Sequence, residues 1–123
     1  MNKKKVLIID DSPFMTQMFS LRLHDEGFES LIAGSGEDGL KIAGNEKPTI
    51  ILLDIAMPGM TGWDVLKSLK SNKETKDIPV LILTNSKGNE EDRERASKLG
   101  AAEYLMKIEL KVDDIIDIVN KYV

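Results

Sequence analysis

The sequence lacks several features that define whole classes of protein. It contains no cysteine, so disulfides are excluded and the cytoplasm is the expected location. No apolar run approaches the length that a bilayer requires, so we expect no membrane insertion. The basic N-terminus is followed by only four apolar residues before Asp10, which is too short a run for a signal peptide.

An excess of positive charge is also missing. The net charge of −4 argues against direct binding to nucleic acid, which requires a basic surface. Hydrophobic residues make up 41% of the chain and charged residues 31%, as in ordinary globular proteins. A length of 123 residues suits one domain with its own core, so we expect a single domain over residues 1–123.

Short apolar runs predict the strands of a sheet. Three runs, at residues 6–9, 50–53 and 80–83, are continuous rather than alternating with polar residues. Such runs are typical of parallel strands that are covered on both faces. Residues 28–33 and 102–106 are weaker strand candidates.

Helical patterns separate these runs. The first predicted helix has Ser12 as N-cap and Pro13 in its first turn, carries apolar residues at helical spacing, and ends at Gly27. Its apolar residues are Phe14, Met15, Met18 and Leu21. Four more helices are predicted, one from Ser35 to before Pro48, one following Gly62, one from the cap Asn89 to Gly100, and one along Val112, Ile115, Ile116 and Val119.

The order of elements is therefore strand then helix, five times. This alternation predicts an α/β fold, a doubly wound parallel sheet with right-handed crossovers and helices on both faces. In such folds functional groups gather beyond the carboxyl ends of the strands.

Polar residues stand at those strand ends. The first strand runs into Asp10 and Asp11, the middle strand into Asp54, the fourth into Thr84 and the last into Lys107. In a parallel sheet all five side chains face one pocket. A carboxylate after a strand is also a common turn former or helix cap. That reading explains the Asp-Asp pair poorly, because Ser12 already supplies the cap.

Clustered carboxylates without histidine or cysteine favour Mg²⁺, which takes oxygen ligands. Such an ion can bridge to a phosphate oxygen. Lys107 and Thr84 can contact other phosphate oxygens. Asp54 is then left as the nucleophile of a phosphoryl transfer, since carboxylates form aspartyl-phosphates.

The chain resembles a response-regulator receiver domain of two-component signalling, the CheY-like family, over its whole length. The matching segments are residues 8–13 (IIDDSP), 53–62 (LDIAMPGMTG), 83–84 (LT) and 104–107 (YLMK). The resemblance implies a flavodoxin-like (βα)5 sheet with strand order 2-1-3-4-5. It also implies that the chain is not an enzyme but a signalling switch that catalyses its own aspartyl phosphorylation and dephosphorylation. The phosphoryl group comes from a histidine kinase or a histidine phosphotransfer protein.

The resemblance further assigns roles to individual residues. It implies that Asp54 is the phosphoacceptor and that Mg²⁺ is held by Asp10, Asp11, Asp54 and the backbone carbonyl of Ala56. Thr84 and Lys107 contact the phosphoryl group. Thr84 and Tyr104 form the switch, and Tyr104 reorients on activation. The expected output is a protein contact on the face formed by the helix after Asn89, the strand at 102–106 and the last helix.

Three departures from the family pattern affect the loops. Lys107 is followed by Ile108 instead of proline, Thr84 is followed by Asn85, and the interval from Thr84 to Lys107 is one residue longer. We therefore expect a trans peptide after Lys107. We also expect slow autodephosphorylation, because Ala56 and Ser86 are poorly suited to position water.

Other readings stay open at this point. A phosphatase or phosphotransferase that forms an aspartyl-phosphate usually has a second Asp two residues on, where this chain has Ala56. A receiver that serves only as a binding module is disfavoured by the presence of all five site residues. A receiver cut from a longer regulator is the third alternative, although Met1 and the absence of a linker favour a stand-alone protein.

Overall fold

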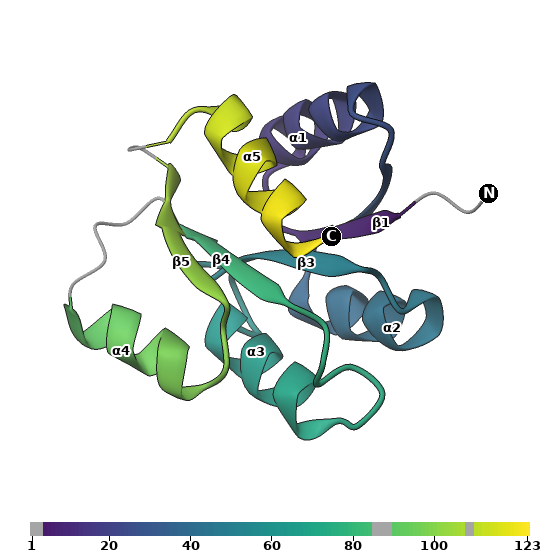
Figure 1. Cartoon of the computed structure of the whole chain (residues 1–123). Helices are drawn as coiled ribbons and strands as arrows, with labels where there is room; N and C mark the ends of the chain where they lie inside the picture. The colour runs from purple at the N-terminus through teal and green to yellow at the C-terminus, as the bar shows by residue number, and fades with distance from the viewer. Residues whose placement is uncertain (1–3, 85–89, 108–109) are drawn as a thin grey trace.

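The computed structural model describes residues 4–84, 90–107 and 110–123. Five strands and five helices alternate along the chain (Figure 1). The strands are β1 Lys5–Ile9, β2 Glu29–Ala33, β3 Ile50–Asp54, β4 Val80–Thr84 and β5 Glu103–Met106. The helices are α1 Pro13–Asp25, α2 Gly36–Glu46, α3 Gly62–Ser71, α4 Glu90–Lys98 and α5 Val112–Tyr122.

All strand pairings are parallel, and the order across the sheet is β2-β1-β3-β4-β5. The doubly wound α/β fold and its strand order are therefore confirmed. From β1 the chain first adds β2 on one side and then crosses to add β3 on the other side. This change of side creates a switch point at the carboxyl ends of β1 and β3. No helix in the described part of the chain is long and apolar enough to cross a membrane.

Helices cover both faces of the sheet. Figure 1 shows α1 and α5 on one side and α2, α3 and α4 on the other. Alternate residues of the central strands point to the two sides, so β1 sends Leu7 and Ile9 into one core and Val6 and Ile8 into the other. The apolar runs lack polar gaps because both of their faces are buried.

Helix caps agree with the sequence where the structure describes them. Ser12 accepts a hydrogen bond from the backbone N–H of Met15, and Ser35 accepts one from that of Asp38. The third helix was expected to follow Gly62, and α3 begins at Gly62 itself. Its N-cap is Thr61, which forms a capping box with Asp64. The cap expected at Asn89 lies outside the described residues.

The buried face of α1 differs from the one that the apolar spacing suggests. Phe14 and Leu21 are 74% and 68% exposed, whereas Phe19 and Leu23 are buried against the sheet together with Thr16. Phe19 and Leu23 are also separated by one helical turn, so spacing alone admits more than one apolar face. Packing on the sheet decides which face of α1 is buried. It is the face of Phe19 and Leu23, which share a core with Val6 and Ile8.

Two glycines offer a test of how the fold positions β3 and α3. A Cβ on Gly62 would fall against the backbone carbonyl of Asp54 and the Cα of Ile55, while a Cβ on Gly44 in α2 would meet nothing within 4 Å. Gly62 therefore lets the start of α3 pack directly on the end of β3.

We predict opposite effects of adding one methyl group. Gly44→Ala should raise the free energy of unfolding by about 0.5–1 kcal/mol, because alanine is the better helix residue. Gly62→Ala should lower it by roughly 1–3 kcal/mol, because backbone has to move to relieve the overlap. Urea unfolding of both variants measures this, and a Gly62→Ala protein as stable as the wild type would contradict the packing argument.

Candidate functional site

The sheet brings the predicted site residues to one edge. Asp54 is the last residue of β3 and Thr84 the last residue of β4, and Lys107 follows β5 directly. Asp10 and Asp11 follow β1. Because β1 and β4 both flank β3, these side chains come from neighbouring positions along the carboxyl edge.

Three carboxylates meet there. Oxygen atoms of Asp10, Asp11 and Asp54 all lie within 4.8 Å of one another. Asp10 and Asp54 are buried, at 5% and 8% exposure, and Asp11 is exposed. The cluster therefore has one open side, through which an ion or a phosphoryl group can enter.

Lys107 reaches the same cluster and pairs with Asp10. Its Nζ donates to Asp10 Oδ2 at 2.6 Å, and both side chains are only 5% exposed. The other oxygen of Asp10 accepts a hydrogen bond from the backbone N–H of Ser12 at 3.0 Å. Each oxygen of Asp10 thus has one hydrogen-bond donor, and the ammonium lies beside the carboxylates rather than in solvent.

Asp54 has weaker partners. Its Oδ1 accepts a hydrogen bond from the backbone N–H of Ala56 at 3.2 Å. Burial raises the pKa of Asp54, and the neighbouring charges of Asp10 and Asp11 raise it further, against the lowering effect of Lys107. Burial and the neighbouring carboxylates therefore disfavour a negative charge on Asp54 and favour the approach of a cation.

Thr84 and Tyr104 lie beside this edge. Thr84 is completely buried, and Tyr104 is 8% exposed and belongs to the core that α2, α3 and α4 cover. Thr84 on β4 lies opposite Met106 on β5. Tyr104 is two residues before Met106 on the same strand. The ring of Tyr104 is therefore already largely buried in this structure.

Arg93 is a neighbour of Tyr104 that the sequence did not single out. Its Nη1 donates to the backbone carbonyl of Tyr104 at 3.3 Å, and its guanidinium carbon lies 5.4 Å from the centre of the tyrosine ring. The run of mixed charges from Glu90 to Arg95 gave no signal for this contact. Ser86 and the peptide between Lys107 and Ile108 lie outside the described residues, so those two expectations remain predictions.

The donor set fits a hard divalent cation. All three clustered side chains offer carboxylate oxygens, and neither histidine nor cysteine takes part in the group. Asp10, Asp11 and Asp54 would hold such an ion, and the ion would offset negative charge between them and an incoming phosphate.

The raised pKa of Asp54 gives a pH-dependent stability prediction. A carboxyl whose folded pKa exceeds its unfolded value stabilises the fold when protonated, and this contribution is lost as the pH rises through the folded pKa. In the presence of a chelator, Asp54→Asn should therefore raise the melting temperature at pH 7 and have less effect at pH 4. Thermal melts at both pH values measure this, with Asp117→Asn, at an exposed position of α5, as the neutral control. An equal gain at both pH values would argue against relief of a buried charge.

Comparisons with known proteins show which family the chain belongs to. The response regulator receiver domain profile matches residues 6–120. Protein PilH of Pseudomonas aeruginosa is 41% identical over 105 residues, which cover 84% of this chain and 84% of PilH. The alkaline phosphatase synthesis transcriptional regulatory protein PhoP of Bacillus subtilis is 36% identical over 85% of this chain. The chain spans only 42% of PhoP, so it corresponds to one part of that longer regulator.

Solved structures show the same fold. The chemotaxis protein CheY4 of Vibrio cholerae superposes with a TM-score of 0.91 at 29% identity, covering 99% of this chain and 100% of that one. A CheY-like receiver domain protein from Methanospirillum hungatei superposes with a TM-score of 0.89 at 25% identity, over 98% and 93% of the two chains. With the profile match across nearly all of its length, the chain belongs to the receiver-domain family of two-component response regulators.

Proposed function

We propose that this receiver accepts a phosphoryl group on Asp54 in a Mg²⁺-dependent reaction and then changes its contacts with a partner protein. The observation that carries the proposal is the meeting of three carboxylates and one ammonium at the end of the sheet. Phosphorelay signalling is the function of the family to which the chain belongs.

The transfer can be written with the residues present. A carboxylate oxygen of Asp54 attacks phosphorus of a phosphohistidine, the new O–P bond forms, and the N–P bond breaks. The bonding electron pair returns to the imidazole nitrogen of the donor. The N–H of Ala56 holds Oδ1 of Asp54 at 3.2 Å, which fixes the carboxylate plane and leaves its other oxygen as the proposed nucleophile.

Positive charge completes the site in this proposal. A bound Mg²⁺ supplies charge neutralisation when Asp10, Asp11, Asp54 and the carbonyl of Ala56 hold it. Lys107 binds a phosphoryl oxygen. For this its ammonium either breaks its ion pair with Asp10 or bonds to both groups at once. Thr84 donates to another phosphoryl oxygen from its buried position.

The partners follow from the same proposal. The donor is a histidine kinase or a histidine phosphotransfer protein, met in the cytoplasm. The output partner is a protein that contacts the face formed by α4, β5 and α5, where Thr84 and Tyr104 transmit the change. The net charge of −4 supports a protein partner over direct contact with nucleic acid.

Labelling tests the acceptor assignment. Incubation with acetyl phosphate and Mg²⁺ should add one phosphoryl group, observed by intact-protein mass spectrometry. Asp54→Asn should lose the label, Asp11→Ala or a chelator should strongly reduce it, and Asp38→Asn on exposed α2 should keep it. Undiminished labelling of Asp54→Asn would show that the acceptor is elsewhere.

The ion pair of Lys107 predicts competition with the metal. Lys107→Gln removes a cation that lies 2.6 Å from Asp10, so the three carboxylates should bind Mg²⁺ more tightly, by roughly tenfold, while labelling slows. Titration with Mg²⁺, followed by the fluorescence of Trp63 or by calorimetry, measures the affinity. Lys98→Gln on exposed α4 is the control, and equal or weaker Mg²⁺ binding by Lys107→Gln would contradict the competition.

A further inference from the structure

Helix α4 is held by little hydrophobic packing. Between Glu90 and Lys98 its one buried residue is Ala96, and most of the others are charged. A helix that buries so little apolar surface depends on specific side-chain contacts for its position. Two arginines on α4 make such contacts with aromatic rings.

Arg93 connects α4 to β5. One guanidinium both donates to the carbonyl of Tyr104 at 3.3 Å and lies 5.4 Å from the centre of its ring. The contact therefore holds the strand backbone and the ring at once. Burial raises the pKa of the Tyr104 hydroxyl, and the charge of Asp92 raises it further, against the smaller lowering effect of Arg93.

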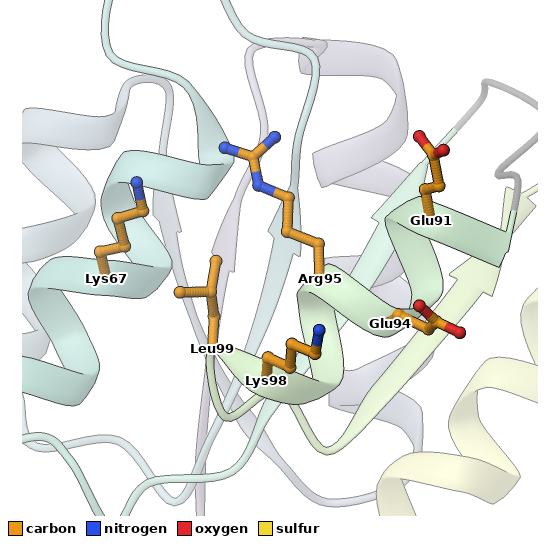
Figure 2. A pocket seen from close by; sticks show the side chains of 6 residues that line it. All are labelled: Lys67, Glu91, Glu94, Arg95, Lys98 and Leu99. Carbon is orange, nitrogen blue, oxygen red and sulfur yellow. The ribbon is translucent and has the colours of Figure 1, made fainter.

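Arg95 connects α4 to α3. Its guanidinium carbon lies 4.3 Å from the centre of the Trp63 ring, which belongs to α3. Figure 2 shows Arg95 extending from α4 toward α3, which carries Lys67, in a pocket that Glu91, Glu94, Lys98 and Leu99 also line. Arg95 is thus a natural comparison for Arg93, because it makes the same kind of contact without touching Tyr104.

We propose that Arg93 is a positioning residue of the switch, which holds the Tyr104 ring in its buried place and so couples Asp54 to the α4–β5–α5 face. The proposal rests on the function proposed above. The contact that Arg93 makes in this structure is with a ring that is only 8% exposed. Loss of the contact therefore favours the exposed ring over the buried one.

The coupling follows from linkage. A phosphoryl group on Asp54 draws the Thr84 hydroxyl toward it and leaves room beside β5 for the ring. Occupancy of Asp54 and burial of the ring then stabilise each other, and the effect is reciprocal. A variant that favours the exposed ring should therefore bind a phosphoryl analogue less tightly. An exposed cation–π contact predicts a loss of about 2- to 5-fold.

The chain has only two tyrosines, Tyr104 and Tyr122, which makes the ring directly observable. Protein labelled with 3-fluorotyrosine should give two ¹⁹F signals, and Tyr122→Phe assigns them. In Arg93→Ala the Tyr104 signal should move toward that of solvent-exposed tyrosine and gain a larger H₂O/D₂O isotope shift. Arg93→Lys keeps the positive charge but lacks the planar guanidinium, and it should shift the Tyr104 signal less. Arg95→Ala should leave it in place.

The second measurement is the affinity for beryllofluoride with Mg²⁺. Arg93→Ala should bind about 2- to 5-fold more weakly than the wild type, and Arg95→Ala should match the wild type. Thermal melts establish that both variants are folded at the temperature used. Hydrogen exchange of α4, β5 and α5 in the wild type, with and without beryllofluoride, reports the output face.

The outcomes separate the two proposals. If the wild type does not bind beryllofluoride, the function proposed for Asp54 fails, while the ¹⁹F comparison still decides whether Arg93 holds the ring. If the wild type binds but Arg93→Ala changes neither signal nor affinity, or Arg95→Ala shifts the Tyr104 signal equally, Arg93 is not a positioning residue.

Discussion

A charge imbalance at one edge of the sheet governs the rest of the site. Three carboxylates share that edge with one ammonium, which leaves a formal charge of −2 (three negative charges less one positive) on the cluster. Two like charges 4 Å apart cost on the order of 4 kcal/mol at an effective dielectric near 20. Burial raises the pKa of Asp54, and the charges of Asp10 and Asp11 raise it further against the lowering effect of Lys107. A divalent cation is the charge that would compensate the cluster.

The same imbalance explains why Lys107 lies where it does. Asp10 is the more buried carboxylate and already accepts a hydrogen bond from Ser12, so the ammonium that bonds its other oxygen completes its partners. Among the described residues, the partner that donates a hydrogen bond to Asp54 is the N–H of Ala56, and the charge of Lys107 also attracts it. The carboxylate that we propose as nucleophile is therefore the less satisfied of the two buried ones, and its reactive oxygen is not committed to the lysine.

Sequence patterns were sufficient for the sheet and for the convergence of the site. Continuous apolar runs mark strands that are buried on both faces, and parallel strands bring their carboxyl ends to one edge. The sequence therefore predicted Asp10, Asp54 and Thr84 at that edge, where the strand bounds place them. The choice of Asp10 over Asp54 by Lys107 could not be predicted, because the long lysine side chain reaches several carboxylates from the same backbone position. The exposed positions of Phe14 and Leu21 show a similar ambiguity, since α1 has more than one apolar row and only the sheet selects among them.

The charged run on α4 was the least informative part of the sequence, yet it holds the Arg93–Tyr104 contact on which we propose that the switch depends. A charged helix is normally read as a solvated surface, and most of α4 is exposed. Its weak hydrophobic packing means that a small change in free energy moves it. Arg93 and Arg95 hold it against β5 and α3 through contacts that are individually weak. In the switch that we propose, a helix fixed by contacts of this size is easier to shift than one fixed by a deeply buried apolar face, because less interaction free energy has to be given up.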